Sequence, residues 1–340
     1  TQKIFKTVVY SIMKKFCIIN IIFLFLVSST TYSKDIYSVG EFISHMQDAH
    51  GFDEEKLITL FDNATISESI LEAIQRPAEK KLVWHQYRKI FIKKKRIEEG
   101  LKFWKNNEST LRRAEEKFGV PAEIIVAIIG VETFYGRISG SYRVIDALNT
   151  LAFHYPKRAP FFRSELEHFL LLTREQKFDP NNLKGSYAGA MGMPQFISSS
   201  YRHYAVDFDN DNVIDIWNNT DDVIGSVANY FSRHGWKSGK SIISKVTIEG
   251  ERYEEILNNK LELNIKASDL KKYGIKTNLS FNSNEMLKLF EYKLENSSEY
   301  WLAENNFYVI TRYNHSKLYA MAVYQLALEV KKLKDNNVIH

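Results

Sequence analysis

Apolar residues are densest between Val120 and Gly136, where aliphatic side chains occupy nearly every position. Pro121 suits the first turn of a helix and Gly136 supplies a stop after the last one. The pattern therefore predicts a buried helix that ends close to Gly136. The many β-branched residues would also fit a buried strand, because short apolar runs do not distinguish the two by period.

The chain from residue 34 onward divides into four stretches by its pattern of apolar and polar residues, and the predicted apolar helix lies in the second of them. Residues 34–106 are polar with helical periodicity and form a predicted helical region, while residues 107–238 hold denser apolar runs and form a predicted core domain. Residues 239–312 contain two β-rich runs, 242–248 and 307–310, which predict strands of a small sheet. Residues 313–340 predict a helix over 318–333, with Ser316 as its cap. The predicted fold class is mainly α (α+β).

The first 33 residues are typical of an export signal. Met13, Lys14 and Lys15 form a basic start, residues 16–27 are apolar, and residues 31–33 fit a small-x-small cleavage site. The apolar stretch is shorter than the roughly 20 residues that a membrane-spanning helix needs, although an uncleaved anchor is the alternative. Residues 1–12 would precede the true start. Cys17, the single cysteine, lies inside the apolar stretch, where it does not fit a lipid-anchor site.

Charge argues against a nucleic-acid partner. The formal net charge is +5, but four of the 46 Lys and Arg and none of the 41 Asp and Glu precede residue 34, which leaves +1 for the remainder. A nearly neutral chain has no polybasic surface for nucleic acid or for an anionic membrane. The lack of cysteine after residue 33 suits an oxidising envelope compartment.

Glu132 is the strongest candidate for chemistry. It follows Ile128 by four residues and Ile129 by three, so a helix places it on an aliphatic face with no basic partner at helical spacing. Desolvation and the negative end of the helix dipole both disfavour its charged form, which is the condition for a general acid near neutral pH. The alternative is a structural carboxylate that pairs with an arginine or caps a neighbouring helix. Glu165 and Glu167 lie in a charged segment and are predicted to be solvated.

An acidic loop follows at residues 207–218. Asp207, Asp209 and Asp211 stand at positions 1, 3 and 5 and the Val213 carbonyl at position 7, as in a calcium-binding EF-hand loop. Position 6 is Asn212 instead of Gly, and position 12 is an Asn where a bidentate Glu is expected. We expect Asp222, or its neighbour Asp221, to close the shell, while Asp215 is not expected to be a direct ligand. A solvated acidic turn without metal is the alternative.

A glycine-rich segment, residues 185–196, lies between these two features. Its glycines allow a ligand to approach the backbone closely, but no lysine follows in the arrangement of a phosphate-binding loop. Ser186 and Gln195 are therefore candidates for hydrogen bonds to the buried acid or to a sugar.

The segment around Glu132, the glycine-rich segment, the acidic loop and residues 226–231 and 312–316 together resemble membrane-bound lytic transglycosylase B and its soluble relatives. The segments occur in the same order as in that family, and the resemblance runs from about Trp84 to Val330. The resemblance implies a lysozyme-like core domain, a helical domain built from both chain ends and a small β domain. It also implies cleavage of the bond between N-acetylmuramic acid and N-acetylglucosamine in peptidoglycan.

Carried over by position, the resemblance implies that Glu132 is the single catalytic acid and base and that Ser186 orients it. The residues that would line the glycan cleft are Gln195, Tyr230, Tyr313, Asn314 and Tyr87; those of the calcium loop are Asp207, Asp209 and Asp211. Two features depart from the family. A Phe161–Phe162 pair replaces a cleft tyrosine, and the loop after Trp217 is one residue longer, which leaves the closing calcium ligand between Asp221 and Asp222.

The resemblance implies a 1,6-anhydro sugar end as the product, formed by a single acid without the second carboxylate that ordinary glycosidases use. The rival hypotheses are a hydrolytic muramidase of the same fold and a non-catalytic, calcium-stabilised wall-binding module. We expect an exported monomer in the periplasm or cell envelope, with peptidoglycan strands as its partner and structural Ca²⁺ as its only cofactor. Membrane association stays open.

Overall fold

The structure is a computed structural model that describes residues 38–76 and 82–338. The expected export signal therefore lies outside the described residues. The chain forms two compact units, one up to Glu54 and one from Glu55 onward. In the first, helix α2 (Val39–His50) begins with a reciprocal cap, in which Ser38 Oγ accepts from the Glu41 amide and the Glu41 carboxylate accepts from the Ser38 amide.

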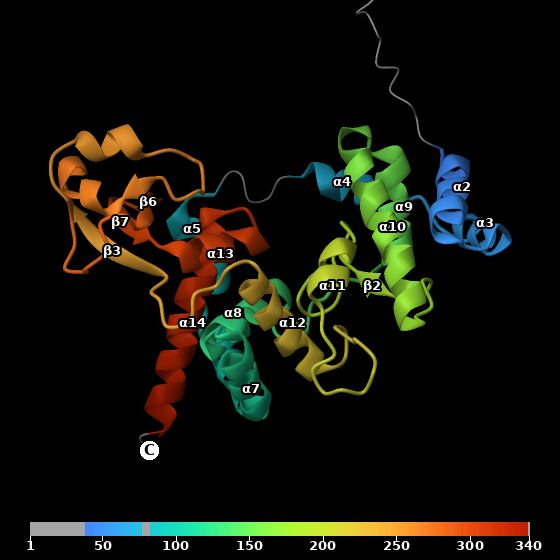
Figure 1. The fold of residues 1–340 in the computed structure, drawn as a ribbon, viewed down its shortest axis with the longest axis horizontal. Coiled ribbons are helices and arrows are strands. Elements are labelled where there is room, and N and C mark those ends of the chain that lie inside the picture. The colour runs from blue at the N-terminus through green and yellow to red at the C-terminus, as the bar shows by residue number, and fades with distance from the viewer. Residues whose placement is uncertain (1–37, 77–81, 339–340) are drawn as a thin grey trace, which may run out of the picture. The chain divides into compact units, whose positions relative to one another are not determined.

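Most elements of the second unit are helices (Figure 1). They are α3 (Glu54–Asp62), which begins at the unit boundary, α4 (Glu68–Gln75), α5 (Trp84–Phe91), α6 (Lys94–Asn106), α7 (Glu108–Phe118), α8 (Ala122–Thr133), α9 (Val144–His154), α10 (Ala159–Gln176), α11 (Ser198–Tyr204), α12 (Thr220–Arg233), α13 (Asn305–Tyr313) and α14 (Lys317–Val338). The strands are β1 (Tyr142–Arg143), β2 (Lys184–Gly185), β3 (Ile243–Ile248), β4 (Ile265–Lys266), β5 (Ile275–Lys276), β6 (Met286–Lys293) and β7 (Ser298–Ala303). The predicted mainly α class with a small sheet is confirmed.

Helix α8 is the predicted apolar helix, and it lies at the centre of the helical body. It packs against α14, α6, α7 and α12, which explains why its apolar residues surround it on all sides. Gly130 has a packing role, because a Cβ there would come within 2.5 Å of the Tyr135 hydroxyl oxygen. Phe134, with φ of 51°, ends the helix two residues before Gly136.

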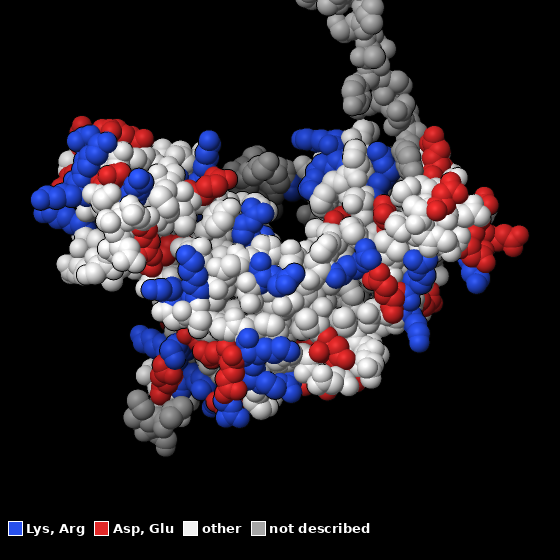
Figure 2. All heavy atoms as spheres, in the orientation of Figure 1, with Lys and Arg blue, Asp and Glu red and all other residues white. Residues whose placement is uncertain are grey.

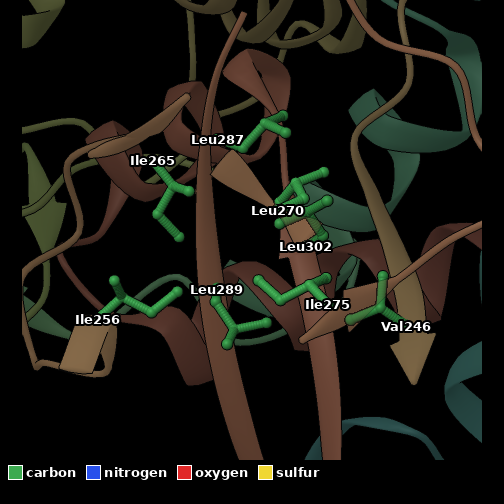
Figure 3. Packing of buried hydrophobic residues seen from close by; sticks show 8 residues of the cluster. All are labelled: Val246, Ile256, Ile265, Leu270, Ile275, Leu287, Leu289 and Leu302. Atoms are coloured by element: carbon green, nitrogen blue, oxygen red, sulfur yellow. The ribbon is translucent and has the colours of Figure 1, made fainter. Parts of the chain in front are cut away.

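The small sheet has the strand order β4-β6-β7-β3-β5, with all neighbours antiparallel. One of its faces carries a compact aliphatic core, and Figure 3 shows the eight side chains that form it. They are Val246, Ile256, Ile265, Leu270, Ile275, Leu287, Leu289 and Leu302. The strand predicted over 242–248 is confirmed as β3.

The strand predicted over 307–310 is wrong, because these residues form the middle of helix α13. Phe307, Val309 and Ile310 are buried, while Asn305, Tyr308 and Arg312 recur at spacings of three and four and keep contact with solvent. This is the period of an amphipathic helix, and four apolar residues were too few to reveal it. The predicted helix over 318–333 is confirmed within α14, and the Ser316 hydroxyl accepts from the Tyr319 amide at 3.3 Å.

Within residues 38–76 and 82–338, no helix combines the length and apolarity needed to cross a membrane. Lys, Arg, Asp and Glu side chains lie interspersed on the face shown in Figure 2.

Candidate active site and acidic loop

Glu132 is the last residue but one of helix α8, and it is half-buried rather than enclosed. The Tyr319 hydroxyl donates a hydrogen bond of 2.5 Å to Glu132 Oε1. Tyr319 itself is only 2% exposed. Its burial raises its pKa well above the usual value, and the nearby charge of Glu132 raises it further. The tyrosine therefore stays protonated and acts as a fixed donor to the carboxyl group.

Tyr319 was not among the sequence candidates. It lies in the first turn of α14, next to apolar residues that give it the appearance of a core position. Tyr87, predicted as a cleft aromatic, is 1% exposed in α5 and lies close enough to Tyr319 to raise the pKa of that hydroxyl. In this structure, Tyr87 therefore lies behind the acid's partner instead of presenting its ring to a ligand.

Thr133 joins the end of α8 to the glycine-rich loop. Its buried hydroxyl donates to the Met193 carbonyl at 3.0 Å and accepts from the Gly136 amide at 3.0 Å. Gly192, in the same loop, has φ of 64°, and a Cβ at this position would come within 2.4 Å of the Ile216 carbonyl oxygen. The loop is thus fixed between the helix that carries Glu132 and the acidic loop.

The two candidates on this loop make local hydrogen bonds. Ser186 Oγ accepts from the amides of Ala188 at 3.3 Å and Ala190 at 3.1 Å, so its hydrogen remains to be donated. Gln195 has φ of 52°, and its side-chain amide donates to the carbonyls of Ser139 and Gly192. Its carbonyl oxygen is the end that remains to accept a bond from a ligand.

A cleft of about 530 Å³ brings three of the predicted residues together: Gln195, Tyr230 and Tyr313. The Tyr313 hydroxyl donates to the Pro194 carbonyl at 2.6 Å, and the Tyr230 hydroxyl donates to the Arg312 carbonyl at 2.7 Å. Burial raises the pKa of Tyr313 well above its usual value, and the charge of Glu132 is the second cause. The cleft wall therefore lies beside the acid. Asn314 directly follows Tyr313 and is half-buried.

Several cleft residues were not predicted. His234 stacks on Tyr230 with ring centroids 4.0 Å apart, at an i, i+4 spacing that the sequence could have shown. Phe161, from the pair that departs from the family pattern, lines the cleft under the Arg158 guanidinium, whereas Phe162 is buried. The remaining unpredicted lining residues are Phe196, Ile197, Ser199, Ser200, His203, Tyr204, Arg312 and His315.

The prediction that Glu165 is solvated is wrong, because its side chain is 4% exposed. Its two oxygens accept from the Ser199 amide at 2.9 Å and the Ser199 hydroxyl at 2.7 Å. Ser199 is the second residue of the short helix α11, so the carboxylate satisfies one of the otherwise unpaired N-terminal donors of that helix. Glu165 therefore resembles a structural cap, and its burial does not make it a second acid for the cleft.

The acidic loop holds Asp207, Asp209 and Asp211 with carboxylate oxygens within 4.8 Å of one another. Backbone amides bind these oxygens from within the loop, since Asp207 accepts from the amides of Asn210, Asp211 and Asn212. Asn212 adopts φ of 70°, so the residue that replaces the usual glycine does take the left-handed conformation. Three converging carboxylates are the donor set that Ca²⁺ prefers.

Asp222 and Asp221 have different surroundings. Asp222 is fully buried, and its two oxygens accept from the amides of Phe208 and Asp215, each at 2.7 Å, which joins both ends of the acidic loop. Burial raises its pKa to about 6, and the charges of Asp209 and Asp207 add to the effect. The Asp221 carboxylate instead accepts a hydrogen bond from the Thr110 hydroxyl, and its Oδ2 lies 3.9 Å from Arg113 Nη2 on α7. Asp215 binds the amides of Trp217 and Asn218.

Comparison with known proteins identifies the family. Residues 37–328 match the Transglycosylase SLT domain family. Over 299 residues, the chain is 42% identical to membrane-bound lytic murein transglycosylase B of Escherichia coli (strain K12), covering 85% of this chain and 81% of the relative. The chain belongs to the membrane-bound lytic transglycosylase B family. It is therefore a lytic murein transglycosylase.

Solved structures of the family agree with the fold. Soluble lytic transglycosylase SltB1 from Pseudomonas aeruginosa is 50% identical, with a TM-score of 0.84 over 87% of this chain and 99% of that one. Escherichia coli Slt35, solved in complex with calcium, is 41% identical, with a TM-score of 0.81 over 87% and 93%. SltB3 from Pseudomonas aeruginosa, solved in complex with NAG-anhNAM-pentapeptide, is 27% identical, with a TM-score of 0.75 over 87% and 79%. The expected lysozyme-like fold is confirmed through Slt35.

Proposed function

We propose that this lytic transglycosylase cleaves the β-1,4 bond between N-acetylmuramic acid and N-acetylglucosamine, with Glu132 as its single acid and base. The observation that carries the proposal is the hydrogen bond from the buried Tyr319 to Glu132 at the end of a rigid helix. It fixes one carboxyl oxygen beside the cleft wall that Tyr313 forms. Glu165, another buried carboxylate of the core, accepts hydrogen bonds from the Ser199 amide and hydroxyl.

In the proposed reaction, protonated Glu132 donates to the glycosidic oxygen, and the carbonyl oxygen of the substrate's own N-acetyl group bonds to C1 as the leaving sugar departs. The Glu132 carboxylate then takes the proton of the muramic acid C6 hydroxyl, whose oxygen closes on C1 and displaces the acetyl oxygen. The enzyme regains its proton, no water is consumed and the product is a 1,6-anhydro end. Because Tyr319 holds Oε1, we assign the transferred proton to Oε2.

The other predicted residues take positioning roles in this proposal. Ser186 has a hydrogen to donate toward the acid or the N-acetyl group. The Gln195 carbonyl oxygen, the rings of Tyr230 and Tyr313, and Asn314 contact the glycan. Tyr87 acts through Tyr319, since its ring is enclosed. Residues 107–238 would form the catalytic core and residues 239–312 the β domain.

The test is Glu132→Gln, a substitution that keeps the shape of the side chain and removes the transferable proton. General acid and base catalysis contributes about 10²- to 10⁴-fold, so anhydro product should fall by at least about 100-fold while glycan affinity and the melting temperature stay near those of the native protein. Mass spectrometry of digested peptidoglycan gives the readout.

The matched control is Glu165→Gln, which should lower stability and keep the anhydro product, because that carboxylate only caps α11. If Glu132→Gln kept full turnover, the assignment would be overturned. Hydrated reducing ends in place of anhydro ends would identify a hydrolytic muramidase instead, and intact glycan would identify a binding module.

We also propose structural Ca²⁺ at the acidic loop, held by Asp207, Asp209, Asp211 and the Val213 carbonyl, with Asp222 as the closing ligand. The converging carboxylates fit the ion, and Asp222 joins both ends of the acidic loop, whereas Asp221 contacts Thr110 and Arg113 on α7. The bound ion would hold the loop and its contact with Gly192. Slt35 in complex with calcium supports this proposal.

For localisation, we propose that the protein is exported and acts as a monomer on peptidoglycan in the periplasm or cell envelope. The relative's description as membrane-bound and the peptidoglycan fragment in the SltB3 structure support this placement.

A further inference from the structure

A second pocket, of about 490 Å³, lies at the other end of helix α13 from the cleft. Most of its lining residues are polar, although their apolar portions also face the pocket, and they carry both signs of charge: Lys237, Lys240, Ser241, Leu263, Asn282, Asn284, Glu285, Met286, Glu304 and Asn305. The lytic reaction described above uses none of these residues. Such a mixture of cations, carboxylates and amides does not suit an apolar ligand or a simple anion.

Glu304 is the distinctive member of this lining. The residue is 6% exposed, and its Oε1 has no hydrogen-bond partner among the described residues. A buried carboxylate oxygen without a donor costs free energy that a ligand's cationic donor would recover. Burial accordingly raises the pKa of Glu304, and the charge of Lys240 opposes this only in part. An ammonium group beside this carboxyl would stabilise its charged form and supply the donor that Oε1 lacks.

The pocket wall is built by specific hydrogen bonds. Asn306 is fully buried, and its side chain accepts from the Lys237 amide at 2.8 Å and donates to the carbonyls of Lys237 and Lys240 at 2.8 and 3.1 Å. Asn305 donates to the Gly235 carbonyl at 2.8 Å. The segment that carries the two lysines is therefore held against the start of α13, and their exposed ammonium groups are placed at the rim, where they fit carboxylates.

Helix α13 connects this pocket to the glycan cleft. Glu304 and Asn305 at the start of α13 line the pocket, and Arg312 and Tyr313 at its end line the cleft. Nine helical residues rise by about 13 Å. Asn305, Tyr308 and Arg312 share one solvent-contacting face between the two sites, and the Arg312 guanidinium lies 6.0 Å from the Tyr308 ring centroid. An extended peptide of four residues spans about the same 13 Å.

We propose that this pocket binds the peptide stem of the strand whose muramic acid occupies the cleft, with Glu304 taking an ammonium group and Lys237 and Lys240 taking carboxylates. The proposal rests on the proposed function, because it uses the glycan position in the cleft. The pocket would make the enzyme favour peptide-bearing over bare glycan.

The first experiment compares kcat/KM on two substrates, glycan that carries stem peptides and the same glycan stripped of peptide by an amidase. Loss of a charged hydrogen bond corresponds to about a tenfold change. Glu304→Gln should therefore raise the KM for peptide-bearing glycan about tenfold and leave the KM for stripped glycan unchanged. Lys240→Gln should also raise the KM for peptide-bearing glycan. Glu295→Gln, an exposed residue in the turn between β6 and β7, is the matched control. Equal losses on both substrates would overturn the proposal.

The second experiment needs no turnover. The probe is the tetrapeptide L-Ala-γ-D-Glu-L-Lys-D-Ala, titrated into the full chain by calorimetry, beside the same peptide with its lysine side chain acetylated. The peptide with the free lysine ammonium should bind about tenfold tighter than the acetylated peptide, and Glu304→Gln should remove this difference in affinity. Equal affinity for both peptides would overturn the proposal. If the peptide bound in this way but the enzyme formed no anhydro product, the proposed reaction would be refuted and the assignment of the peptide pocket would stand.

Discussion

The hydrogen bond between Tyr319 and Glu132 joins residues 187 positions apart in the sequence. The tyrosine is buried and remains protonated, so it can donate throughout the working pH range. A neutral donor fixes the carboxyl group without introducing a competing acid or base. Geometry at this one residue pair therefore supports the assignment of acid and base duty to a single glutamate.

Tyr319→Phe tests this role of the hydroxyl. Removing one donor from a charged acceptor costs about 1.5 kcal/mol, so kcat should fall about tenfold while KM and the melting temperature change little. Steady-state kinetics and thermal unfolding provide the two measurements. A fall in melting temperature without any change in kcat would assign the tyrosine a purely structural role.

Tyr319 also shows what the sequence could not provide. The sequence could single out Glu132 as a candidate acid, because a lone carboxylate in an aliphatic helix is visible in local spacing. Its partner comes from a different helix and lies in an apolar segment, so only the packing of α14 on α8 reveals it. Glu165 was misassigned for the converse reason, since the helix start that binds it lies 34 residues away.

At the scale of elements, the contact between helix α8 and the glycine-rich loop holds the acid and the cleft in register. Thr133 joins them through Met193, and the adjacent Pro194 binds Tyr313 on α13. Two helices from distant parts of the chain, α8 and α13, therefore meet around one short loop.

Thr133→Val tests this connection, because valine keeps the volume of the side chain and removes the hydroxyl. The Met193 carbonyl and the Gly136 amide would both lose their bonds to this hydroxyl, so the free energy of unfolding should fall by about 2 kcal/mol and kcat should fall with it. Urea denaturation measures the first quantity. The control is Thr173→Val, a buried threonine that bonds only within its own helix, where the loss should stay below about 1 kcal/mol. Equal losses in the two variants would contradict a special role for Thr133.

Element assignment succeeded where the pattern was long and failed where it was short. The apolar helix was marked by its length and by the flanking Pro121 and Gly136, β3 by a β-rich run over 242–248, and α14 by a long amphipathic stretch. Residues 307–310 are helical because the burial of their neighbours in the whole molecule decides between two structures that four apolar residues fit equally well.

At the scale of the whole molecule, Asp222 connects the acidic loop to helix α12 and the core. Its folded-state pKa of about 6 exceeds the 3.8 of an ordinary aspartate. Without metal, its contribution to stability is therefore complete below about pH 4 and is lost as the pH rises through 6. A bound cation favours the carboxylate and reverses this loss.

Calcium should consequently stabilise the protein far more at pH 7.5 than at pH 5. Metal binding needs deprotonated ligands, and an ion at 100 times its Kd contributes about 2.7 kcal/mol. Chelation should lower the melting temperature clearly at pH 7.5 and little at pH 5, and added calcium should restore it. Asp209→Asn should remove the response, whereas Asp179→Asn, in an exposed turn, should keep it. A melting temperature indifferent to chelator at pH 7.5 would refute the calcium site.

The late position of residues 313–319 has a consequence for biosynthesis. Tyr313 of the cleft wall and Tyr319, the hydroxyl partner of Glu132, are both translated long after Glu132 itself. A polypeptide that ends before Tyr313 would lack these groups, so a wall-degrading activity cannot begin before residues 313–319 have been synthesised.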